Sequence, residues 1–235
     1  MSIYGEVFLI PVWLDDEAPS VIPQYVLESI KKCSVFFVEN ERSARRFLKN
    51  LCKEIVIDEY QWFTIHKTEA EQKTIFVNKL KEGITIGIIS EAGCPGIADP
   101  GQILVAAAHE IGARVNPLVG PSAIVLALMA SGMNGQSFQF VGYLPVEQTQ
   151  RIKVIKELEL ESKKKHCTQV FIETPYRNNQ LIDTVLKTCN AGTRFCIAAD
   201  LTGQAQFIKT KTILEWKEKI PDLHKKPAIF CLIAE

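Results

Sequence analysis

The stretch "SEAGCPGIADPG", residues 90–101, holds residues suited to cradling a small ligand. It lies between an apolar run, "ITIGIIS", and a helical pattern, "QILVAAAHEIG". Gly93 and Gly96 permit positive φ and a close approach of the backbone to a ligand. Pro95 and Pro100 fix φ and remove amide donors. The sequence therefore predicts a stiff turn with exposed backbone amides and carbonyls.

Three polar side chains of this stretch add chemistry. Ser90 can donate a hydrogen bond at the end of a strand, and Glu91 can accept one from hydroxyl groups or an amine. Asp99 is expected to cap the helix that begins near Gly101. The same pattern also fits a plain strand-to-helix connection, with Asp99 as N-cap and Pro100 in the first helical turn. The chain contains neither of the usual glycine-rich phosphate motifs.

A second stretch of this kind is "LVGPSAIVLAL", residues 118–128. Gly120 and Pro121 turn the chain, Ser122 is placed to cap, and an almost wholly apolar helix follows. Taken alone, this pattern is also typical of the start of a buried helix. Two such turns in one chain favour a ligand site.

Charged residues next to apolar strands supply candidate catalytic groups. Glu39 and Glu173 could orient an acceptor or remove its proton. Arg42 and Arg177 could hold a phosphate or a carboxylate through two parallel hydrogen bonds. The structural alternative is that Glu173 and Arg177 form an i, i+4 ion pair and that Arg42 is a solvated side chain. Tyr176 could stack on a flat acceptor or simply pack against its neighbours.

These residues must be positioned by alternating strands and helices. Apolar, β-branched runs predict strands, and segments with a helical period separate them, which is typical of strands joined by helical crossovers. The predicted strands of the first half are 7–10, 35–38, 55–58, 84–89 and 114–117, and its helices are 23–32, 43–50, 69–82 and 102–111. The second half is predicted to have strands at 138–141, 168–172, 194–198 and 228–233, a hairpin around 207–212, and helices at 122–131, 148–159, 178–189 and 214–219.

The predicted fold class is α/β, with two α/β domains in tandem. Pro117, Gly120 and Pro121 interrupt the pattern, which places the domain boundary between residues 1–117 and 118–235. A ligand cleft is expected between the domains, since such clefts and the carboxyl ends of strands are preferred binding places.

Composition excludes several classes of protein. Of the 235 residues, 47% are hydrophobic and 23% charged, as in ordinary globular proteins. Lys and Arg balance Asp and Glu at 27 each, so no global positive field attracts nucleic acid. The run "KKK" at 163–165 is interpreted as a solvated loop that could touch RNA.

The seven cysteines lack a C-x-x-C pair and the four histidines are isolated, which indicates reduced thiols and no metal site. No apolar run is long enough for a membrane span and no signal segment is recognised, so a cytoplasmic protein is expected.

At both turns the sequence resembles the tetrapyrrole methylase superfamily, the class III S-adenosylmethionine-dependent methyltransferases. It is similar above all to the branch that methylates the 2'-hydroxyl of a cytidine in small-subunit rRNA. Four segments carry the resemblance in order along nearly the whole chain: "GIISEAGCPGIADPG", "PLVGPSAIVLALMASGM", "FVGYLP" and "FIETPYR".

The resemblance implies two α/β domains that bind the methyl donor in a cleft between them, in a homodimer. It implies mostly main-chain contacts to the donor, and no metal. The implied cofactor-binding residues are Pro11, Ser90, Glu91, Ala92, Pro95, Ala98, Ser122, Ala123, Phe171, Ile172 and Ala228. Methyl transfer needs alignment of the reacting atoms and exclusion of water, and a hydroxyl acceptor also needs a base.

The sequence departs from the family where the acceptor is expected. The family's Thr-Pro-Ile-Gly-Asn loop reads "PVWLDDEAPS" here, which keeps Pro11 but adds bulky and acidic residues. Its Glu-Asp-Thr-Arg segment reads "ENER", in which Asn40 cannot act as a base. Its Arg-Glu-Leu-Thr-Lys segment reads "ADLTGQ", so Gly203 replaces the lysine, and a later glutamate corresponds to Gln206. The departures predict an intact donor site beside an altered acceptor site.

Three functions remain open on the sequence. The first is a methyltransferase related to 16S rRNA ribose methylation, with the small ribosomal subunit as partner. The second is a methyltransferase of a small molecule such as a tetrapyrrole. The third is a relative that binds S-adenosylmethionine or RNA without transferring a methyl group.

Overall fold

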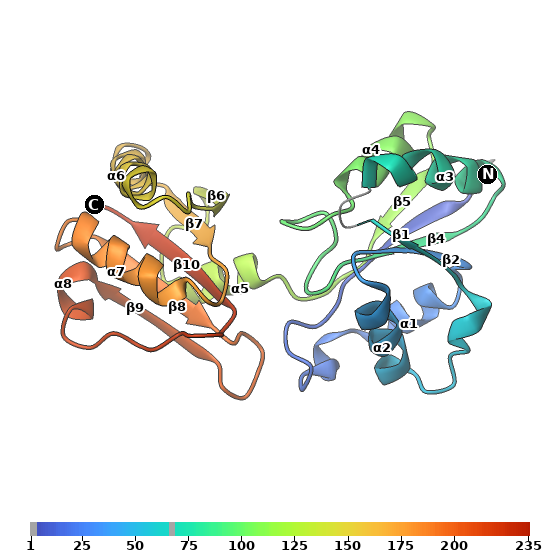
Figure 1. Cartoon of the computed structure of the whole chain (residues 1–235), viewed down its shortest axis with the longest axis horizontal. Coiled ribbons are helices and arrows are strands. Elements are labelled where there is room, and N and C mark those ends of the chain that lie inside the picture. Colours follow the sequence, from blue (N-terminus) through green and yellow to red (C-terminus); the bar gives the residue numbers. More distant parts are fainter. Residues whose placement is uncertain (1–3, 66–68) are drawn as a thin grey trace. The chain divides into compact units, whose positions relative to one another are not determined.

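The computed structural model describes residues 4–65 and 69–235. The chain divides into two compact units, Met1–Ser122 and Ala123–Glu235, each with its own sheet (Figure 1). We call them unit 1 and unit 2. The alternation of strands and helices expected from the sequence is confirmed, and the fold class is α/β.

Unit 1 is built on five parallel strands in the order β3-β2-β4-β1-β5. In chain order these are β1 (Glu6–Ile10), β2 (Val35–Val38), β3 (Gln61–Thr64), β4 (Ile86–Ile89) and β5 (Arg114–Pro117). Every residue of β2 and β4 is buried, as expected for strands covered on both faces. The carboxyl ends of all five strands therefore meet at one edge of the sheet.

Helices cover both faces of this sheet (Figure 1). Helices α1 (Gln24–Ile30) and α2 (Glu41–Leu51) pack on one face in a core that includes Phe36 and Phe47. Helices α3 (Glu69–Lys81) and α4 (Gln102–Glu110) pack on the other, around Phe76 and Leu104. This two-sided cover explains the apolar runs of the strands.

One predicted strand is wrong. Residues 55–58 do not form a strand; Ile57–Glu59 makes a short 3-10 turn, and β3 follows at Gln61–Thr64. The aromatic side chains of β3 decide the register, because Trp62 stacks on Phe36 at 5.0 Å and Phe63 stacks on Phe37 at 4.9 Å between ring centroids. Cross-strand aromatic pairs of this kind stabilise the pairing of neighbouring strands.

Unit 2 contains a mixed sheet in the order β6-β7-β10-β8-β9. Only β6 and β7 are parallel; β10 is antiparallel to both of its neighbours, and β8 is antiparallel to β9. The strands are β6 (Phe138–Tyr143), β7 (Thr168–Ile172), β8 (Arg194–Ala199), β9 (Phe207–Thr212) and β10 (Ala228–Ile233).

One face of this sheet packs against α6 (Gln148–Lys165), α7 (Asn178–Thr188) and α8 (Ile213–Trp216) in a single core. Helix α5 (Ala123–Ser131) contacts β8, β9 and β10, and its buried residues are absent from that core, so it covers the other face. The "KKK" run is not a loop, since it forms the last turn of α6. Lysines there complement the negative end of the helix dipole.

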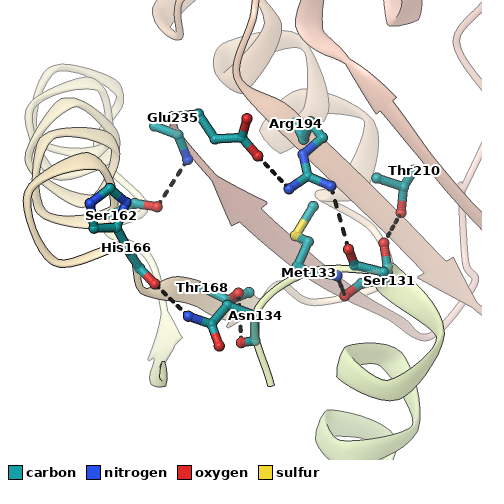
Figure 2. Close-up of polar contacts among 11 residues, drawn as sticks. Ser131, Met133, Asn134, Ser162, His166, Thr168, Arg194, Thr210 and Glu235 are labelled. Atoms are coloured by element: carbon teal, nitrogen blue, oxygen red, sulfur yellow. Dashed lines mark hydrogen bonds and ion pairs between the residues drawn. The ribbon is translucent and has the colours of Figure 1, made fainter. Parts of the chain in front are cut away.

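Polar contacts fix the end of α5 to the sheet of unit 2 (Figure 2). Thr210 donates to the Ser131 carbonyl at 2.7 Å, and Arg194 donates to the Gly132 carbonyl at 3.4 Å. The Asn134 side chain donates to the His166 carbonyl at 2.7 Å. The segment that leaves α5 is therefore held from both the β8–β9 side and the end of α6.

None of the helices within residues 4–65 and 69–235 has the length and apolarity needed to span a membrane. In the same ranges, which omit His66, no group of three or more histidine, cysteine, aspartate or glutamate side chains is arranged to hold a metal ion.

Candidate active site

The predicted residues of unit 1 lie where its central strands end. Pro11 follows β1, Glu39 follows β2, and Ser90 and Glu91 follow β4. Strands β1, β4 and β2 are adjacent and parallel, so these positions share one edge of the sheet. In open α/β sheets, ligands bind at this carboxyl edge.

The turn at residues 90–101 is tied directly to the loop after β1. The Val12 amide donates to the Gly93 carbonyl at 2.9 Å, and the Gly93 amide donates back to the Val12 carbonyl at 3.0 Å. Gly93 and Gly96 have φ of 70° and 77°, as their type predicts. Ala98 also has a positive φ, 64°, which is uncommon for a residue with a side chain.

The second turn packs against the same place. A Cβ atom added to Gly120 would lie 2.2 Å from the Cβ atom of Pro11. The Cys94 thiol lies 3.5 Å from the Pro121 carbonyl. Glycine is therefore required at position 120 for the loops after β1, β4 and β5 to meet.

Three carboxylates gather at this edge. The Glu91 amide donates to the Glu39 carboxylate at 3.2 Å, and the Ser43 hydroxyl donates to the Glu91 carboxylate at 3.0 Å. Burial of Asp99, together with the negative charges of Glu39 and Glu91, raises the Asp99 pKa to about 6, although a hydrogen bond from Ser90 opposes the shift. A carboxyl group with a pKa shifted towards neutrality by such neighbours is a candidate functional group.

Asp99 does not cap α4, contrary to the expectation from the sequence. The N-cap residue is Gly101, which makes no side-chain cap bond. The Glu69 carboxylate, at the start of α3, accepts instead from the amides of Gly101 at 3.0 Å, Ile103 at 2.8 Å and Leu104 at 3.3 Å. Because Glu69 accepts hydrogen bonds from the first amides of α4, the Asp99 carboxylate is not needed as the cap of this helix.

Helix α2 also begins at this edge. Its N-cap is Asn40, whose side chain accepts from the amides of Arg42 at 3.0 Å and Ser43 at 3.3 Å. Asn40 therefore has a structural role. Arg42 and Arg46 are exposed one helical turn apart, whereas the Arg45 side chain pairs with Asp58 at 2.9 Å.

A pocket of about 340 Å³ opens in unit 1 beside the turn. The loop after β1 contributes one wall, α2 another, and the beginning of the turn a third. The lining residues are Val12, Trp13, Leu14, Asp15, Asp16, Ser43, Arg46, Phe47, Glu91 and Ala92. Of the predicted donor residues, only Glu91 and Ala92 line it.

The pocket was only partly foreseeable from the sequence. The bulky and acidic residues at 13–16 were recognisable as a departure from the family pattern. The contribution of Arg46, Ser43 and Phe47 depends on how α2 packs, and no motif in the sequence indicates it. The sequence likewise did not indicate that Asp99 lies beside Glu39 and Glu91 with a raised pKa.

In unit 2, Glu173 and Arg177 form the i, i+4 ion pair that was the structural alternative. Both Arg177 Nε, at 3.0 Å, and Arg177 Nη2, at 2.7 Å, donate to Glu173 Oε1. The hydrogen bond raises the Arg177 pKa. Glu173 is only 4% exposed, and within the described part of the chain its Oε2 atom has no hydrogen-bond partner.

The other predicted residues of unit 2 lie nearby on two strands. Ile172 pairs with Ile229 across β7 and β10, which places Ala228 one residue beyond that pair. Phe171 is fully buried and Ala228 is 8% exposed. Tyr176 is 70% exposed, with its ring 5.9 Å from that of His224.

Ser122 and Ala123, from the second turn, are both half-buried and stand on either side of the boundary between the units. In unit 1, Pro11 and Pro95 are buried, whereas Glu91, Ala92 and Ala98 are exposed.

Comparison with curated proteins gives a consistent set of relatives. The chain is 31% identical over 195 residues to ribosomal RNA small subunit methyltransferase I of Vibrio cholerae, covering 83% of this chain and 65% of that protein. It is 29% identical over 219 residues to the protein of the same name from Buchnera aphidicola, covering 91% and 73%. The chain thus spans 65% of the length of the Vibrio relative. No family model matches the chain.

Solved structures share the fold. The methyltransferase CobJ superposes with a TM-score of 0.66 at 14% identity, covering 98% of this chain and 94% of CobJ. A conserved hypothetical protein from Aeropyrum pernix superposes with a TM-score of 0.70 at 13% identity, covering 99% and 85%. The chain therefore has the fold of the methyltransferase CobJ, and over 83% of its length it is similar to a small-subunit rRNA methyltransferase I.

Proposed function

We propose that the protein is an S-adenosylmethionine-dependent methyltransferase that modifies the RNA of the small ribosomal subunit. The observation that carries this proposal is the similarity to ribosomal RNA small subunit methyltransferases I, which extends over 83% of the chain in the Vibrio cholerae protein. The two turns that resemble the family's donor loops lie in the structure where ligands of α/β sheets usually bind.

The residues of unit 1 suit the proposed donor. S-adenosylmethionine supplies an activated methyl group on a positively charged sulfur atom and carries an ammonium group. Glu39, Glu91 and Asp99 place negative charge at the carboxyl edge, where it favours a cationic ligand. The turn offers backbone groups, because its glycines and prolines leave few side chains in the way. The proposed contacts in this unit are Pro11, Ser90, Glu91, Ala92, Pro95, Ala98 and Ser122, and those in unit 2 are Ala123, Phe171, Ile172 and Ala228.

A hydroxyl acceptor must lose its proton during transfer. Glu39 and Asp99 are the carboxylates that we assign to this task, since both lie at the donor edge. Glu173 is committed to Arg177 through one oxygen and serves to hold that guanidinium in place. Arg42 and Arg177 are the proposed phosphate-binding groups.

The family resemblance also leads us to propose a homodimer that works in the cytoplasm, where small ribosomal subunits are found. Light scattering coupled to gel filtration measures the first property. A mass of one chain of 26.4 kDa would contradict the homodimer.

Two measurements test the activity. Isothermal titration with S-adenosylmethionine and S-adenosylhomocysteine is expected to show saturable binding. Transfer of a labelled methyl group is then expected with small ribosomal subunits and not with a metabolite extract. Mapping the methylated nucleotide by nuclease digestion and mass spectrometry identifies the acceptor atom.

Other results of these two measurements would favour other functions. Label in the metabolite extract alone would favour a small-molecule methyltransferase. Saturable donor binding without transfer to either acceptor would favour a relative that binds without catalysis. Absence of donor binding at millimolar concentration would contradict the proposal altogether.

A further inference from the structure

The pocket of unit 1 is lined by buried aromatic side chains and by exposed polar side chains. Trp13 is only 4% exposed, and its ring packs edge-on against Phe47 at 4.7 Å between centroids. Its indole nitrogen donates to Asp16 Oδ1 at 2.9 Å, and Asp16 Oδ2 lies 3.2 Å from Arg46 Nη2. This chain of contacts orients the Arg46 guanidinium at the rim, where 64% of its side chain stays exposed.

The polar lining of the pocket includes more hydrogen-bond acceptors than donors. Asp15 and Glu91 line it with carboxylates, which act only as acceptors when ionised. One Asp15 oxygen accepts from the Glu17 amide at 2.8 Å and one Glu91 oxygen accepts from Ser43 at 3.0 Å, so each carboxylate has a second oxygen for a ligand. Hydroxyl and amino groups suit this interior, whereas a phosphate group would be repelled.

The wall formed by α2 has the opposite charge. Arg42 and Arg46 are exposed at i and i+4, on one side of the helix, and Arg46 belongs to the pocket lining. A guanidinium has five donors in a planar fork and binds phosphate oxygens through two of them, so Arg46 can retain Asp16 and still contact a phosphate. The carboxylate oxygens of the lining suit a neutral group that donates hydrogen bonds, and the two guanidinium groups on α2 suit phosphates joined to that group.

We propose that this pocket receives one unpaired nucleotide of an RNA strand, with its ribose and base inside and the adjacent phosphates along Arg42 and Arg46. This inference rests on the proposed function and defines its acceptor as single-stranded. A volume of about 340 Å³ lies within the range of small-ligand pockets. A base must leave its stack to enter such a pocket, which excludes a paired nucleotide.

Fluorescence anisotropy with the full chain and a labelled, unstructured RNA of twelve nucleotides tests this directly, without donor and without turnover. The wild type is expected to bind the single strand about tenfold more tightly than the same sequence in a duplex. The double variant Arg42→Gln, Arg46→Gln is expected to lower the slope of log affinity against log salt by about 1.4, at ~0.7 for each lost phosphate contact. Lys153→Gln with Lys187→Gln removes the same charge from exposed positions of unit 2 and should leave the slope unchanged.

The variant Asp15→Asn distinguishes binding of a nucleotide in the pocket from simple attraction of RNA to the arginines. If the nucleotide donates hydrogen bonds to Asp15, the variant binds the single strand several-fold more weakly. If only the RNA phosphates bind, at the two arginines, removal of the nearby negative charge of Asp15 strengthens RNA binding instead. Asp183→Asn, at an exposed position of α7, is the matched control. Circular dichroism and thermal midpoints check that each variant is folded.

Equal affinity for duplex and single strand, an unchanged salt slope in the arginine variant, or tighter binding by Asp15→Asn would each overturn the pocket proposal. So would a wild type that binds no single-stranded RNA. Methylation of small subunits that persists alongside any of these results leaves the proposed function standing. Loss of methylation and of donor binding in the wild type would remove both.

Discussion

Asp99 lies at the carboxyl edge of the unit 1 sheet, where we propose that S-adenosylmethionine binds. Its negative charge there destabilises the folded protein. Its pKa of about 6 means that the folded protein binds a proton more tightly at this site than the unfolded chain, in which an aspartate has a pKa of about 3.9. The stability that Asp99 supports is therefore present below about pH 4 and is lost as the pH rises to about 6. Residues that cost stability in this way are found at functional sites.

We therefore expect Asp99→Asn to raise the free energy of unfolding at pH 7.5. Each pKa unit corresponds to about 1.4 kcal/mol, and solvent screening at this half-buried site reduces the expected gain to about 1 kcal/mol. The gain should disappear by pH 4, where the wild-type carboxyl is also neutral. Urea unfolding at several pH values measures it, and calorimetry should show weaker binding of the cationic donor to the variant.

Glu28→Gln, at an exposed carboxylate of α1, provides the control for loss of one negative charge. A stability gain for Asp99→Asn that is equal at pH 4 and pH 7.5 would contradict the assigned protonation. An unchanged affinity for S-adenosylmethionine would show that Asp99 does not contribute to binding of the methyl donor.

The pairing of Glu173 with Arg177 was one of the two alternatives that the sequence offered, although the pair lies in the turn that precedes α7 and not within the helix. Glu39 and Glu91 were both expected at the ligand site, but the approach of Asp99 to them was not, since it depends on the course of the turn after β4. Local spacing identifies pairs within one element. It does not report which separate residues share an edge.

At the scale of elements, most bounds follow from hydrophobic periodicity. Strand β2 and strand β7 agree with the predicted ranges residue for residue. Strand β3 does not, because its position depends on the stacking of Trp62 and Phe63 on side chains of β2. Helix α6 continues six residues beyond its predicted end and stops at His166, which has a left-handed φ of 49°. Helix extent in a charged segment is set by such C-terminal details.

The start of α4 gives a prediction at this scale. Glu69 belongs to α3 and yet satisfies the first amides of α4, so the two helices are joined electrostatically as well as by packing. Glu69→Ala is expected to lower the free energy of unfolding by about 1 kcal/mol, as removal of an N-cap does. Donor affinity should fall as well, because the turn at residues 90–101 leads directly into α4.

Glu71→Ala is the matched control, since Glu71 lies exposed in the same turn of α3. Guanidinium unfolding and donor titration of both variants provide the comparison. Equal effects of the two substitutions would show that Glu69 acts through the dipole of α3 and not as the cap of α4.

At the scale of the whole molecule, each hydrophobic core belongs to one unit, whereas the proposed ligand contacts come from both units. The cluster that contains Phe36 and the one that contains Phe76 draw their residues from unit 1, whereas the cluster that contains Trp216 draws its residues from unit 2. The proposed donor contacts come from both units. Folding and binding should therefore respond differently when the chain is divided.

Residues 1–122 and 123–235, expressed as separate polypeptides, are expected each to unfold cooperatively in urea, because about 100 residues with their own core suffice for a domain. Neither fragment should bind S-adenosylmethionine as tightly as the full chain in calorimetry, since each keeps only part of the proposed contacts. Mixing the fragments should recover little affinity, because dividing the chain removes the high effective concentration of one unit near the other. Full affinity in fragment 1–122 alone would confine the donor to the carboxyl edge of unit 1 and exclude Phe171, Ile172 and Ala228 from its site.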